Sequence, residues 1–361
     1  MKTTVWLILV TLLSFPAAAQ KQAPTPNTNS AWHFAVSGDS RNCGNVVMPA
    51  IAVGVRNDAA AFYWHLGDLR VIDGPDEDYK AEPEHRGKPV DRKSYLENAW
   101  PDFIHSQLQA FAPMPFFIGI GNHEIKPPKT REEFVRQFSE WLDSPVLRKQ
   151  RLADNPNDNR VRTYYHWIQG GVDFMYLDNA TPDQFDDAQM KWVEGVLQRA
   201  EKNPAVKSVV VGMHEALPDS LAAGHSMNNS QHGAESGRRV YRDLIKFHQQ
   251  SKKNVYILAS HSHFYMSGIF NSDAWRSQDA VLPGWIIGTA GAVRYALPPD
   301  KDQAREALTK VYGYLLGTVN GDGSVDFKFQ QLSPEAIHAA SDARFGPDFV
   351  NYCIEKNADF K

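Results

Sequence analysis

The chain has 361 residues, of which 38 are basic and 42 acidic, so its formal net charge at pH 7 is -4. This balance argues against the basic surface of a nucleic-acid-binding protein, and we expect no nucleic-acid footprint. The chain is not a small disulfide-stapled fold, because it holds only two cysteines. Its length suits one large α/β domain or two ordinary ones.

The N-terminus has the pattern of a secretory signal peptide. Lys2 precedes an apolar stretch over residues 5–15 that is too short to span a bilayer, and small residues follow at 17–19. We therefore predict a signal peptide over residues 1–19, cleaved near Ala19, and a secreted or periplasmic protein. The alternative is an N-terminal membrane anchor. Residues 20–30 are expected to form a flexible leader, and we predict no transmembrane helix in the mature chain.

The first half of the mature chain alternates strand and helix patterns. Apolar runs predict strands over residues 32–36 and 61–66 and from 116 up to Gly121. Helical spacing predicts helices over 46–55, 93–111 and 130–142, the second of them kinked or split by Pro101. Charges and prolines over 73–92 indicate a surface loop.

The second half continues the alternation. A polar stretch over 152–162 predicts a loop, and hairpins are expected over 164–177 and 311–330. Further strands are predicted over 206–211, 254–259 and 285–287, and helices over 186–201, over 238–249 and from Ser333, with a long loop over 218–237. Without an internal repeat or interior linker, we expect one domain over 31–332 and a C-terminal extension, 333–361, packed on it.

Five of the predicted strands end in glycine or serine followed by polar side chains. These strand ends deliver Asp39, Asp68, Asn122 with His123, His214, and His261 with His263. In open α/β sheets, chemistry collects beyond the carboxyl ends of the strands. A set of carboxylate, imidazole and amide groups without a thiol suits ions such as Mn, Fe or Zn. Asp68 is our candidate for a carboxylate shared by two ions about 3.5–4 Å apart.

This ordered set has a family counterpart. The sequence carries Gly38-Asp39, Gly67-Asp68, Gly121-Asn122-His123-Glu124, His214 and His261-x-His263. Over residues 32–330 it resembles the calcineurin-like metallophosphoesterase superfamily, whose members include purple acid phosphatases. The resemblance implies an α/β fold in which two packed mixed β-sheets are flanked by helices as a four-layer sandwich. It also implies hydrolysis of phosphate esters by a hydroxide that two metal ions (Fe, Mn or Zn) activate.

The resemblance assigns a role to each matching residue. It implies that one ion is held by Asp39 and His263 and the other by Asn122, His214 and His261, with Asp68 as the bridge. His123 resembles the family's histidine that is not a ligand and that stabilises the transition state or protonates the leaving oxygen. Glu124 is expected to orient this loop or that imidazole.

The sequence departs from the family pattern in three places. Arg41 stands where the family commonly has a histidine ligand of the first ion, Val71 where purple acid phosphatases have a tyrosine, and Ser260 where a glycine is usual. Arg41 cannot ligate, because it is a permanent cation; we predict that it binds a substrate phosphate, with a surface or a salt-bridging arginine as the alternative. Further candidates for contact with substrate are His225, His232 and Arg294.

Two other readings of the sequence remain open at this point. Gly38-Asp39-Ser40 resembles the nucleophile motif of GDSL-type serine esterases, for which the nearest activating pair is Glu335 and His338. A catalytically silent member of the metallophosphoesterase fold, which binds metal or a phosphorylated ligand, is the second alternative. The sequence leaves open the substrate, the oligomeric state and the pairing of Cys43 with Cys353.

Overall fold

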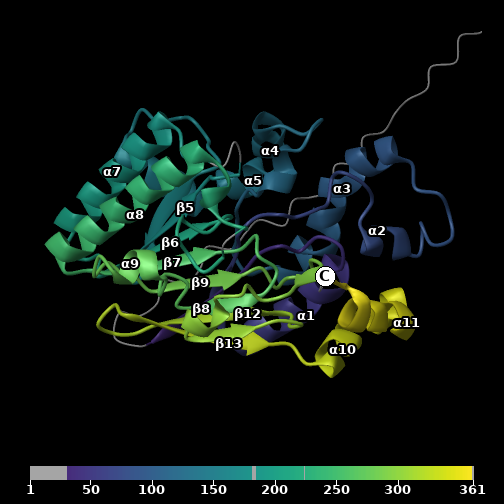
Figure 1. Cartoon of the computed structure of the whole chain (residues 1–361). Coiled ribbons are helices and arrows are strands. Elements are labelled where there is room, and N and C mark those ends of the chain that lie inside the picture. Colours follow the sequence, from purple (N-terminus) through teal and green to yellow (C-terminus); the bar gives the residue numbers. More distant parts are fainter. Residues whose placement is uncertain (1–30, 181–183, 223, 360–361) are drawn as a thin grey trace, which may run out of the picture.

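The computed structural model describes residues 31–180, 184–222 and 224–359, so the predicted signal peptide and leader lie outside the described residues. Two mixed β-sheets pack face to face, and helices cover their outer faces (Figure 1). The smaller sheet has the strand order β13-β12-β1-β2-β3, and the larger has the order β11-β8-β9-β7-β6-β5-β4. The predicted fold class is confirmed.

The smaller sheet is built around parallel strands. These are β1 (Trp32–Ser37), β2 (Ala60–His65) and β3 (Phe116–Ile118), and β12 (Gly313–Val319) and β13 (Val325–Gln331) add antiparallel neighbours. Side chains of β2 alternate between its two faces. Tyr63 therefore lies on the outer face of the sheet, where its hydroxyl contacts Met48 of α1 (Gly44–Asn57). Helix α1 in turn packs against α10 (Pro334–Phe345).

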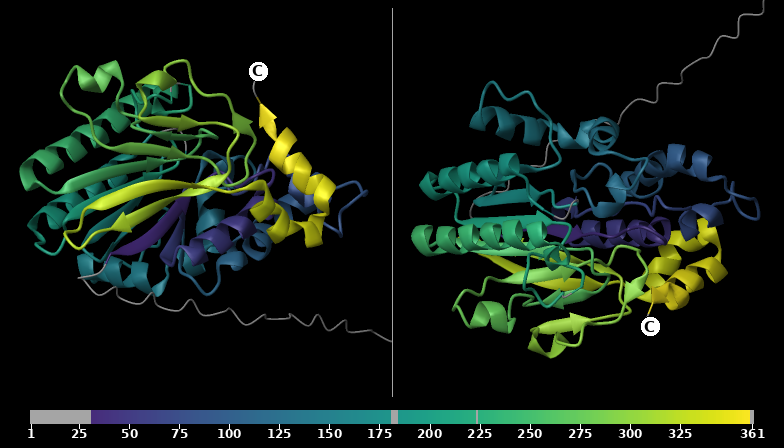
Figure 2. Two further views of the ribbon diagram at one scale, coloured as in Figure 1. Left: turned by 90° about the horizontal axis from the view of Figure 1, so that it is seen from below. Right: turned by 45° about the horizontal axis from the view of Figure 1, so that its top comes forward.

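The larger sheet consists of β4 (Tyr165–Gln169), β5 (Val172–Leu177), β6 (Ser208–Met213), β7 (Asn254–Ala259), β8 (Tyr265–Ser267), β9 (Gly284–Ile287) and β11 (Glu306–Leu308). Its central strands β5, β6, β7 and β9 are parallel. Helices α7 (Asp187–Lys202) and α8 (Gln231–Ser251) lie side by side on its outer face (Figure 2). Their buried apolar stripes, which include Val193 and Leu244, face strand residues such as Val209.

Aromatic side chains fill the space between the two sheets. The Phe62 ring of the smaller sheet lies 5.2 Å from Phe174 and 5.4 Å from Trp167 of the larger one, measured between ring centroids. Phe117 stacks on Trp167 at 3.9 Å. Aromatic pairs in such arrangements contribute about 0.5–1.5 kcal/mol each beyond their burial. These contacts fix the two sheets relative to each other, and with them the positions of their strand ends.

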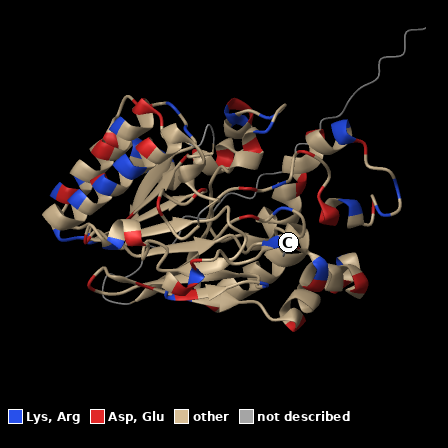
Figure 3. Cartoon of the chain, viewed as in Figure 1, with Lys and Arg blue, Asp and Glu red and all other residues tan. Residues whose placement is uncertain are grey.

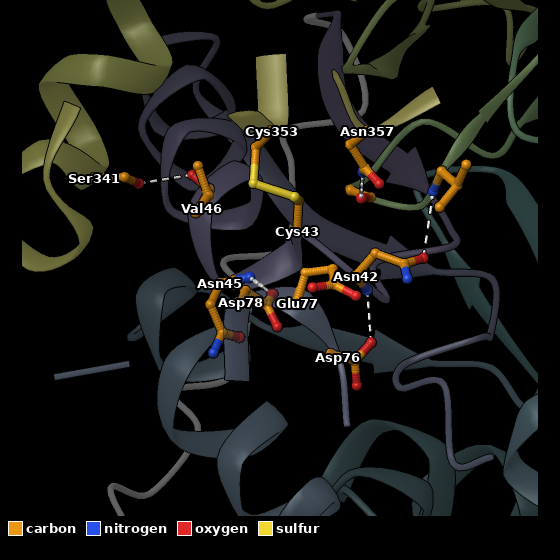
Figure 4. The surroundings of a disulfide bond; sticks show 12 residues. Asn42, Cys43, Asn45, Val46, Asp76, Glu77, Asp78, Ser341, Cys353 and Asn357 are labelled. Carbon is orange, nitrogen blue, oxygen red and sulfur yellow. Dashed lines mark hydrogen bonds between the residues drawn. A yellow bond between two sulfur atoms is a disulfide. The ribbon is translucent and has the colours of Figure 1, made fainter. Parts of the chain in front are cut away.

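The C-terminal segment is tied to the loop that follows β1. It contains α10, α11 (Pro347–Asn351), the π-helix η5 (Tyr352–Lys356) and β14 (Ala358–Asp359), which pairs with β10 (Arg294–Tyr295). Cys43 and Cys353 form a disulfide with a Cα–Cα distance of 5.9 Å (Figure 4), which settles their pairing. The Ser341 hydroxyl also donates to the Val46 carbonyl at 2.7 Å.

The prediction of a surface loop over 73–92 holds for residues 83–91, which are irregular and mostly exposed, but is wrong for the residues before them. The segment contains the short helix α2 (Glu77–Ala81), and three of its acidic side chains are buried: Asp76, Asp78 and Glu82. The cause is the buried Arg70, whose Nη1 donates to Asp78 at 2.8 Å. Buried charges persist in proteins when they are paired in this way.

Several predicted helix boundaries also differ. Helix α3 (Arg92–Ser106) continues through Pro101, because burial of Trp100 and Phe103 holds it, and η1 (Leu108–Phe111) follows. The helix predicted over 130–142 is divided into α4 (Arg131–Gln137) and α5 (Ser139–Leu142), and α6 (Pro145–Asp154) extends into the predicted loop over 152–162. The shorter helices are η2 (Asn122–Ile125), η3 (Met227–Asn229), α9 (Asp273–Arg276) and η4 (Lys301–Gln303).

Charged side chains of both signs are interspersed along the outer surfaces of α7 and α8 (Figure 3). One such pair, Glu194 and Arg239, links the two helices at 2.5 Å. Among the helices of the described residues, none combines the length and apolarity needed to cross a bilayer.

Candidate metal centre

Asp39 and Asp68 come directly after the parallel strands β1 and β2. Both adopt the left-handed backbone conformation, with φ of 61° and 60°. Non-glycine residues in this conformation cluster at functional sites, where the surrounding structure enforces them. Here the enforcement comes from two backbone hydrogen bonds, Asp39 N to Gly67 O and Ser40 N to Asp68 O, each 3.0 Å. The two carboxylates are therefore held side by side.

Gly121 permits a third loop to approach them closely. A Cβ at this position would lie 2.4 Å from Asp68 Oδ1, so only glycine fits without displacing the carboxylate. The loop then continues into η2, where the His123 backbone N–H donates to the same Asp68 oxygen at 3.0 Å. The end of β3 is thereby joined to the ends of β1 and β2.

The first acid–histidine group consists of Asp39, Asp68 and His263. One potential ligand atom from each lies within 4.8 Å of the other two. Asp39 Oδ1 is 3.2 Å from His263 Nε2, and Asp39 Oδ2 accepts the backbone N–H of His261 at 2.7 Å. Burial alone would raise the pKa of Asp39, but His263 and His214 lower it to about 2. Asp39 is therefore a carboxylate at neutral pH.

The second acid–histidine group consists of Asp68, His214 and His261, and Asn122 adjoins it. His214 Nε2 lies 3.0 Å from both Asn122 Oδ1 and His261 Nδ1 and 3.3 Å from Asp68 Oδ1. Burial would lower the pKa of His214, but Asp68 and Asp39 raise it to about 10. The acceptors around His214 Nε2 therefore strongly favour a positive charge at this position.

His123 and Glu124 stand next to the two groups without being part of them. His123 Nδ1 donates to the Val71 carbonyl at 2.5 Å, so its Nε2 faces the centre, 3.8 Å from Asp68 Oδ2. Burial lowers the pKa of His123, although Asp68 opposes the shift. Glu124 accepts backbone N–H groups of Gly121, Asp68 and Leu69 at 2.8–2.9 Å. It therefore orients the loops and not the imidazole.

Arg41 enters the first group. Its Nη2 lies 2.9 Å from His263 Nε2, and its Nε lies 3.4 Å from Asp68 Oδ2. The side chain is 13% exposed, so Arg41 is not a surface arginine. Tyr295 stacks on the His263 ring at 4.0 Å and also interacts with Arg41.

The three remaining candidates from the sequence have different positions. His225 reaches the centre: its ring lies 5.4 Å from that of His261 and 5.1 Å from that of Tyr295. His232 does not, because α8 begins at Gln231 and leaves His232 exposed in its first turn.

Arg294 is also directed away from the centre. Its guanidinium donates to carbonyls of the C-terminal segment, Asn357 O at 3.0 Å and Cys353 O at 3.5 Å. It also lies over the Tyr312 ring. Arg294 therefore binds backbone groups of this chain, and the structure does not bring it to the cleft.

Two further residues, Ser260 and Asn179, support the site. The Ser260 hydroxyl lies 3.1 Å from His214 Nδ1 and donates to Leu66 O, a use of the hydroxyl that a glycine could not provide. Asn179, which follows β5, hydrogen bonds to the backbone N–H and C=O of Glu215 and so fixes the turn after His214. Sequence reasoning did not single out Asn179, although its position at a strand end was the available signal.

The donor set fits metal ions. Asp39 Oδ1 and Asp68 Oδ2 are buried and accept no hydrogen bond within the described part of the chain. Buried polar atoms are seldom left in this state, and a place for a bound ion is one of the standard reasons. Carboxylate oxygen and imidazole nitrogen suit Mn, Fe and Zn. The buried Asp and His groups could therefore hold metal ions.

The geometry does not support the serine-esterase reading. His338, the histidine that it requires, hydrogen bonds with Asp342 at 2.8 Å and Asn351 at 3.1 Å on the C-terminal helices. Ser40 instead lies between the two carboxylate loops, with its backbone N–H bound to Asp68 O.

Comparisons with solved structures identify the fold. The chain is similar to purple acid phosphatase PPD1 from yellow lupin (Lupinus luteus) seeds, with 16% identity over 86% of this chain and 53% of that one and a TM-score of 0.56. It is similar to PhoD with 14% identity, coverage of 86% and 73%, and a TM-score of 0.51. GAP50, the anchor in the inner membrane complex of Plasmodium, matches with 12% identity, coverage of 83% and 84%, and a TM-score of 0.49.

These likenesses concern the fold. The chain spans about half the length of the lupin phosphatase that it matches. No known protein family matches the sequence, and no curated protein sequence does so either. The fold is that of the calcineurin-like metallophosphoesterases, as the sequence resemblance implied.

Proposed function

We propose that this chain, built on the calcineurin-like metallophosphoesterase fold, is an enzyme that hydrolyses phosphate esters with the help of bound metal ions. One observation carries the proposal: two buried acid–histidine groups share Asp68, and buried oxygens of Asp39 and Asp68 lack hydrogen-bond partners within the described residues. A structural core has no need of such a concentration of unpaired acceptors, because each of them costs free energy when buried.

The proposed ligands follow the two groups. Asp39 and His263 belong to the first site, Asn122, His214 and His261 belong to the second, and Asp68 is common to both. Bound Fe, Mn or Zn ions would lower the pKa of a water molecule to about 7 and offset negative charge on the phosphoryl oxygens. The hydrogen bonds of Glu124 keep Asp68 in place between the sites.

The other residues act on the substrate. We assign to His123 Nε2 the transfer of a proton to the leaving oxygen, because Nε2 faces the centre; the donor is the cationic imidazole, since Nδ1 keeps its own hydrogen on Val71 O, and the neutral form remains after transfer. Arg41 and His225 are the proposed contacts of the phosphoryl oxygens, since Arg41 contacts His263 of the first group and the His225 ring lies 5.4 Å from that of His261 of the second. Arginine suits this role because its planar fork matches the oxygens of a phosphate.

Secretion or a periplasmic location is part of the proposal. The predicted signal peptide and the Cys43–Cys353 disulfide both favour an oxidising compartment. N-terminal sequencing of the protein exported from an expression host tests this point, and a mature N-terminus close to Gln20 is expected.

The activity is tested on purified protein with a chromogenic phosphomonoester and a phosphodiester. We expect hydrolysis of at least one ester in the presence of added Mn²⁺ and its loss after treatment with a chelator. Asp68→Asn removes the shared carboxylate charge and is expected to abolish turnover. Bound ions without hydrolysis of any ester would instead identify a silent, ligand-binding member of the fold. Inhibition by a serine-directed organophosphate but not by a chelator would contradict the metal-dependent reaction.

A further inference from the structure

The backbone that carries Arg41 has little freedom. The next residue but one, Cys43, is held by the disulfide to Cys353, and the backbone N–H of Asn42 donates to Asp76 at 2.6 Å (Figure 4). Asn42 itself has a φ of 68°, and Cys43 N donates to Gly291 O at 3.1 Å. The starting point of the Arg41 side chain is therefore fixed, and the guanidinium points into the first acid–histidine group.

Arg41 contacts two residues that would otherwise face a metal ion: it donates a hydrogen bond to His263, and its charge lies near Asp68 without a hydrogen bond. His263 Nδ1 lies 2.6 Å from the Val293 carbonyl oxygen, which can only accept, so the hydrogen is on Nδ1. Nε2 consequently offers its lone pair, and Arg41 Nη2 lies 2.9 Å from it. The same guanidinium is 3.4 Å from Asp68 Oδ2 through its Nε. Two of the three residues in the first group thus already face a cation.

The second group is arranged differently. His214 Nε2 meets the oxygen of Asn122 and the Nδ1 atom of His261 at 3.0 Å each, and Asp68 Oδ1 at 3.3 Å. These atoms are acceptors or can become acceptors by losing a proton. A metal ion would satisfy them together, because no guanidinium takes part in the contacts that define this group.

The charges of the surrounding residues also favour one bound ion over two. Three carboxylates line the two groups, Asp39, Asp68 and the buried Glu215, which lies 3.8 Å from His261 Nε2, and Arg41 is a permanent cation beside them. One divalent ion balances three carboxylates and one guanidinium, whereas two divalent ions would leave an excess of two positive charges. Burying uncompensated charge is unfavourable, so the second ion would have to displace the guanidinium or remain weakly bound.

We propose that Arg41 takes the place of a metal ion in the first group, so that the chain binds a single ion, at Asp68, Asn122, His214 and His261. The inference rests on the proposed function and reduces its two ions to one. The guanidinium then supplies the positive charge that the first ion would give to a bound phosphate. It has five N–H donors, and its contacts with His263 and Asp68 leave others for phosphoryl oxygens.

The test counts bound ions. Protein stripped with a chelator is titrated with Mn²⁺ in a calorimeter, dialysed and submitted to elemental analysis, and its electron paramagnetic resonance spectrum is recorded. We expect one ion per chain and the six-line spectrum of an isolated Mn²⁺ ion. Arg41→His removes the cation and adds a ligand, so two ions per chain and the spectrum of a spin-coupled pair are expected.

Two further variants control the result. Arg41→Met removes the cation without adding a ligand, and we expect it to bind a second ion at least tenfold more weakly than Arg41→His does. Arg56→His makes the same exchange at an exposed position near the end of α1, where the guanidinium bonds Ala110 O, and is expected to keep one ion. Circular dichroism checks that the variants are folded, and the wild-type count decides the question if they are not.

The outcomes separate this inference from the proposed function. Two tightly bound ions in the wild type would overturn the inference and leave the proposed function intact. One ion in the wild type and in both folded Arg41 variants would also overturn it, because the first group would then not be a metal site at all. One ion in the wild type with a second in Arg41→His, but no ester hydrolysis, would support the inference and refute the enzyme. No bound ion in the wild type would overturn both.

Discussion

His166, on the edge strand β4 of the larger sheet, lies between two carboxylates. Its Nδ1 is 2.8 Å from Asp173, its Nε2 is 2.5 Å from Asp154, and its side chain is only 4% exposed. Burial lowers the pKa of His166, but Asp173 and Asp154 outweigh it and raise the pKa from 6.5 to about 9. The imidazole is therefore charged in the folded protein at neutral pH.

The shift predicts a pH dependence of stability. Between pH 6.5 and 9 the unfolded chain has lost the His166 proton and the folded chain keeps it, so the free energy of unfolding falls as pH rises. One pKa unit corresponds to about 1.4 kcal/mol, and the stabilisation present below pH 6.5 amounts to about 3 kcal/mol, which is lost as pH passes about 9. His166→Gln removes this contribution and leaves the buried Asp173 without its cation, whereas Asp154 keeps its ion pair with Arg199. We expect it to cost about 3–5 kcal/mol at pH 6.

Urea denaturation of both proteins at pH 6, 7, 8 and 9, in the presence of a chelator, measures the effect. The difference between wild type and His166→Gln is expected to shrink by about 3 kcal/mol over this range. His232→Gln is the matched control, because His232 is exposed on α8, and it should change the free energy of unfolding by less than about 0.5 kcal/mol. A difference that stays constant from pH 6 to 9 would refute the assignment of a proton to His166.

Three further predictions concern the site and its attachment. Asp68→Ala should lose both metal and turnover, whereas His123→Ala should keep its metal, measured by elemental analysis, and lose about 10²–10⁴-fold in turnover; metal loss in the latter would contradict the division of roles. Replacing Cys43 and Cys353 with serine opens a link across 310 residues and should lower the free energy of unfolding by about 3–5 kcal/mol in denaturant titrations. Arg294→Met should lower the melting temperature and leave KM unchanged, and a raised KM at unchanged stability would restore its substrate role.

The strand ends could be predicted from the sequence because their signals are local. An apolar run that stops at glycine predicts a buried strand and its exit turn, as at Gly67 and Gly121. Parallel strands of one sheet end at the same edge, so the polar residues after them are expected to meet. The carboxylates of Asp39 and Asp68 and the imidazoles of His214, His261 and His263 do lie together in two groups.

The charged segment after β2 could not be predicted in the same way. Its acidic residues give the composition of a solvated loop, and the sequence shows no partner for them nearby. In the structure Arg70 is fully buried and pairs with Asp78 and with Asp102, which lies on α3. The ion pairs with Arg70 allow these carboxylates to be buried instead of hydrated. One of the pairs involves α3, which cannot be foreseen from the sequence of the segment itself.

The position of Arg294 could not be predicted from the sequence for a related reason. A cation next to a glycine-rich turn at a strand end has the pattern of a phosphate ligand. The structure satisfies its donors with carbonyl oxygens of a segment about 60 residues later, which β14 and the disulfide hold in place. Every residue has a backbone carbonyl, so the sequence does not indicate which carbonyl oxygens will accept hydrogen bonds from an arginine.

For Arg41, one property could be predicted from the sequence and another could not. The sequence establishes that it cannot ligate a metal ion, because a guanidinium has donors and no lone pair to offer. Only the folded chain shows that its Nη2 meets His263 Nε2 and its Nε approaches Asp68. A metal ion and a guanidinium are thus alternative partners for the same acceptors, one as a Lewis acid and the other as a hydrogen-bond donor. Under the proposal above, arginine in place of the histidine that the resemblance leads one to expect lowers the number of ions but keeps a positive charge for the phosphate, and hydrolysis is still expected.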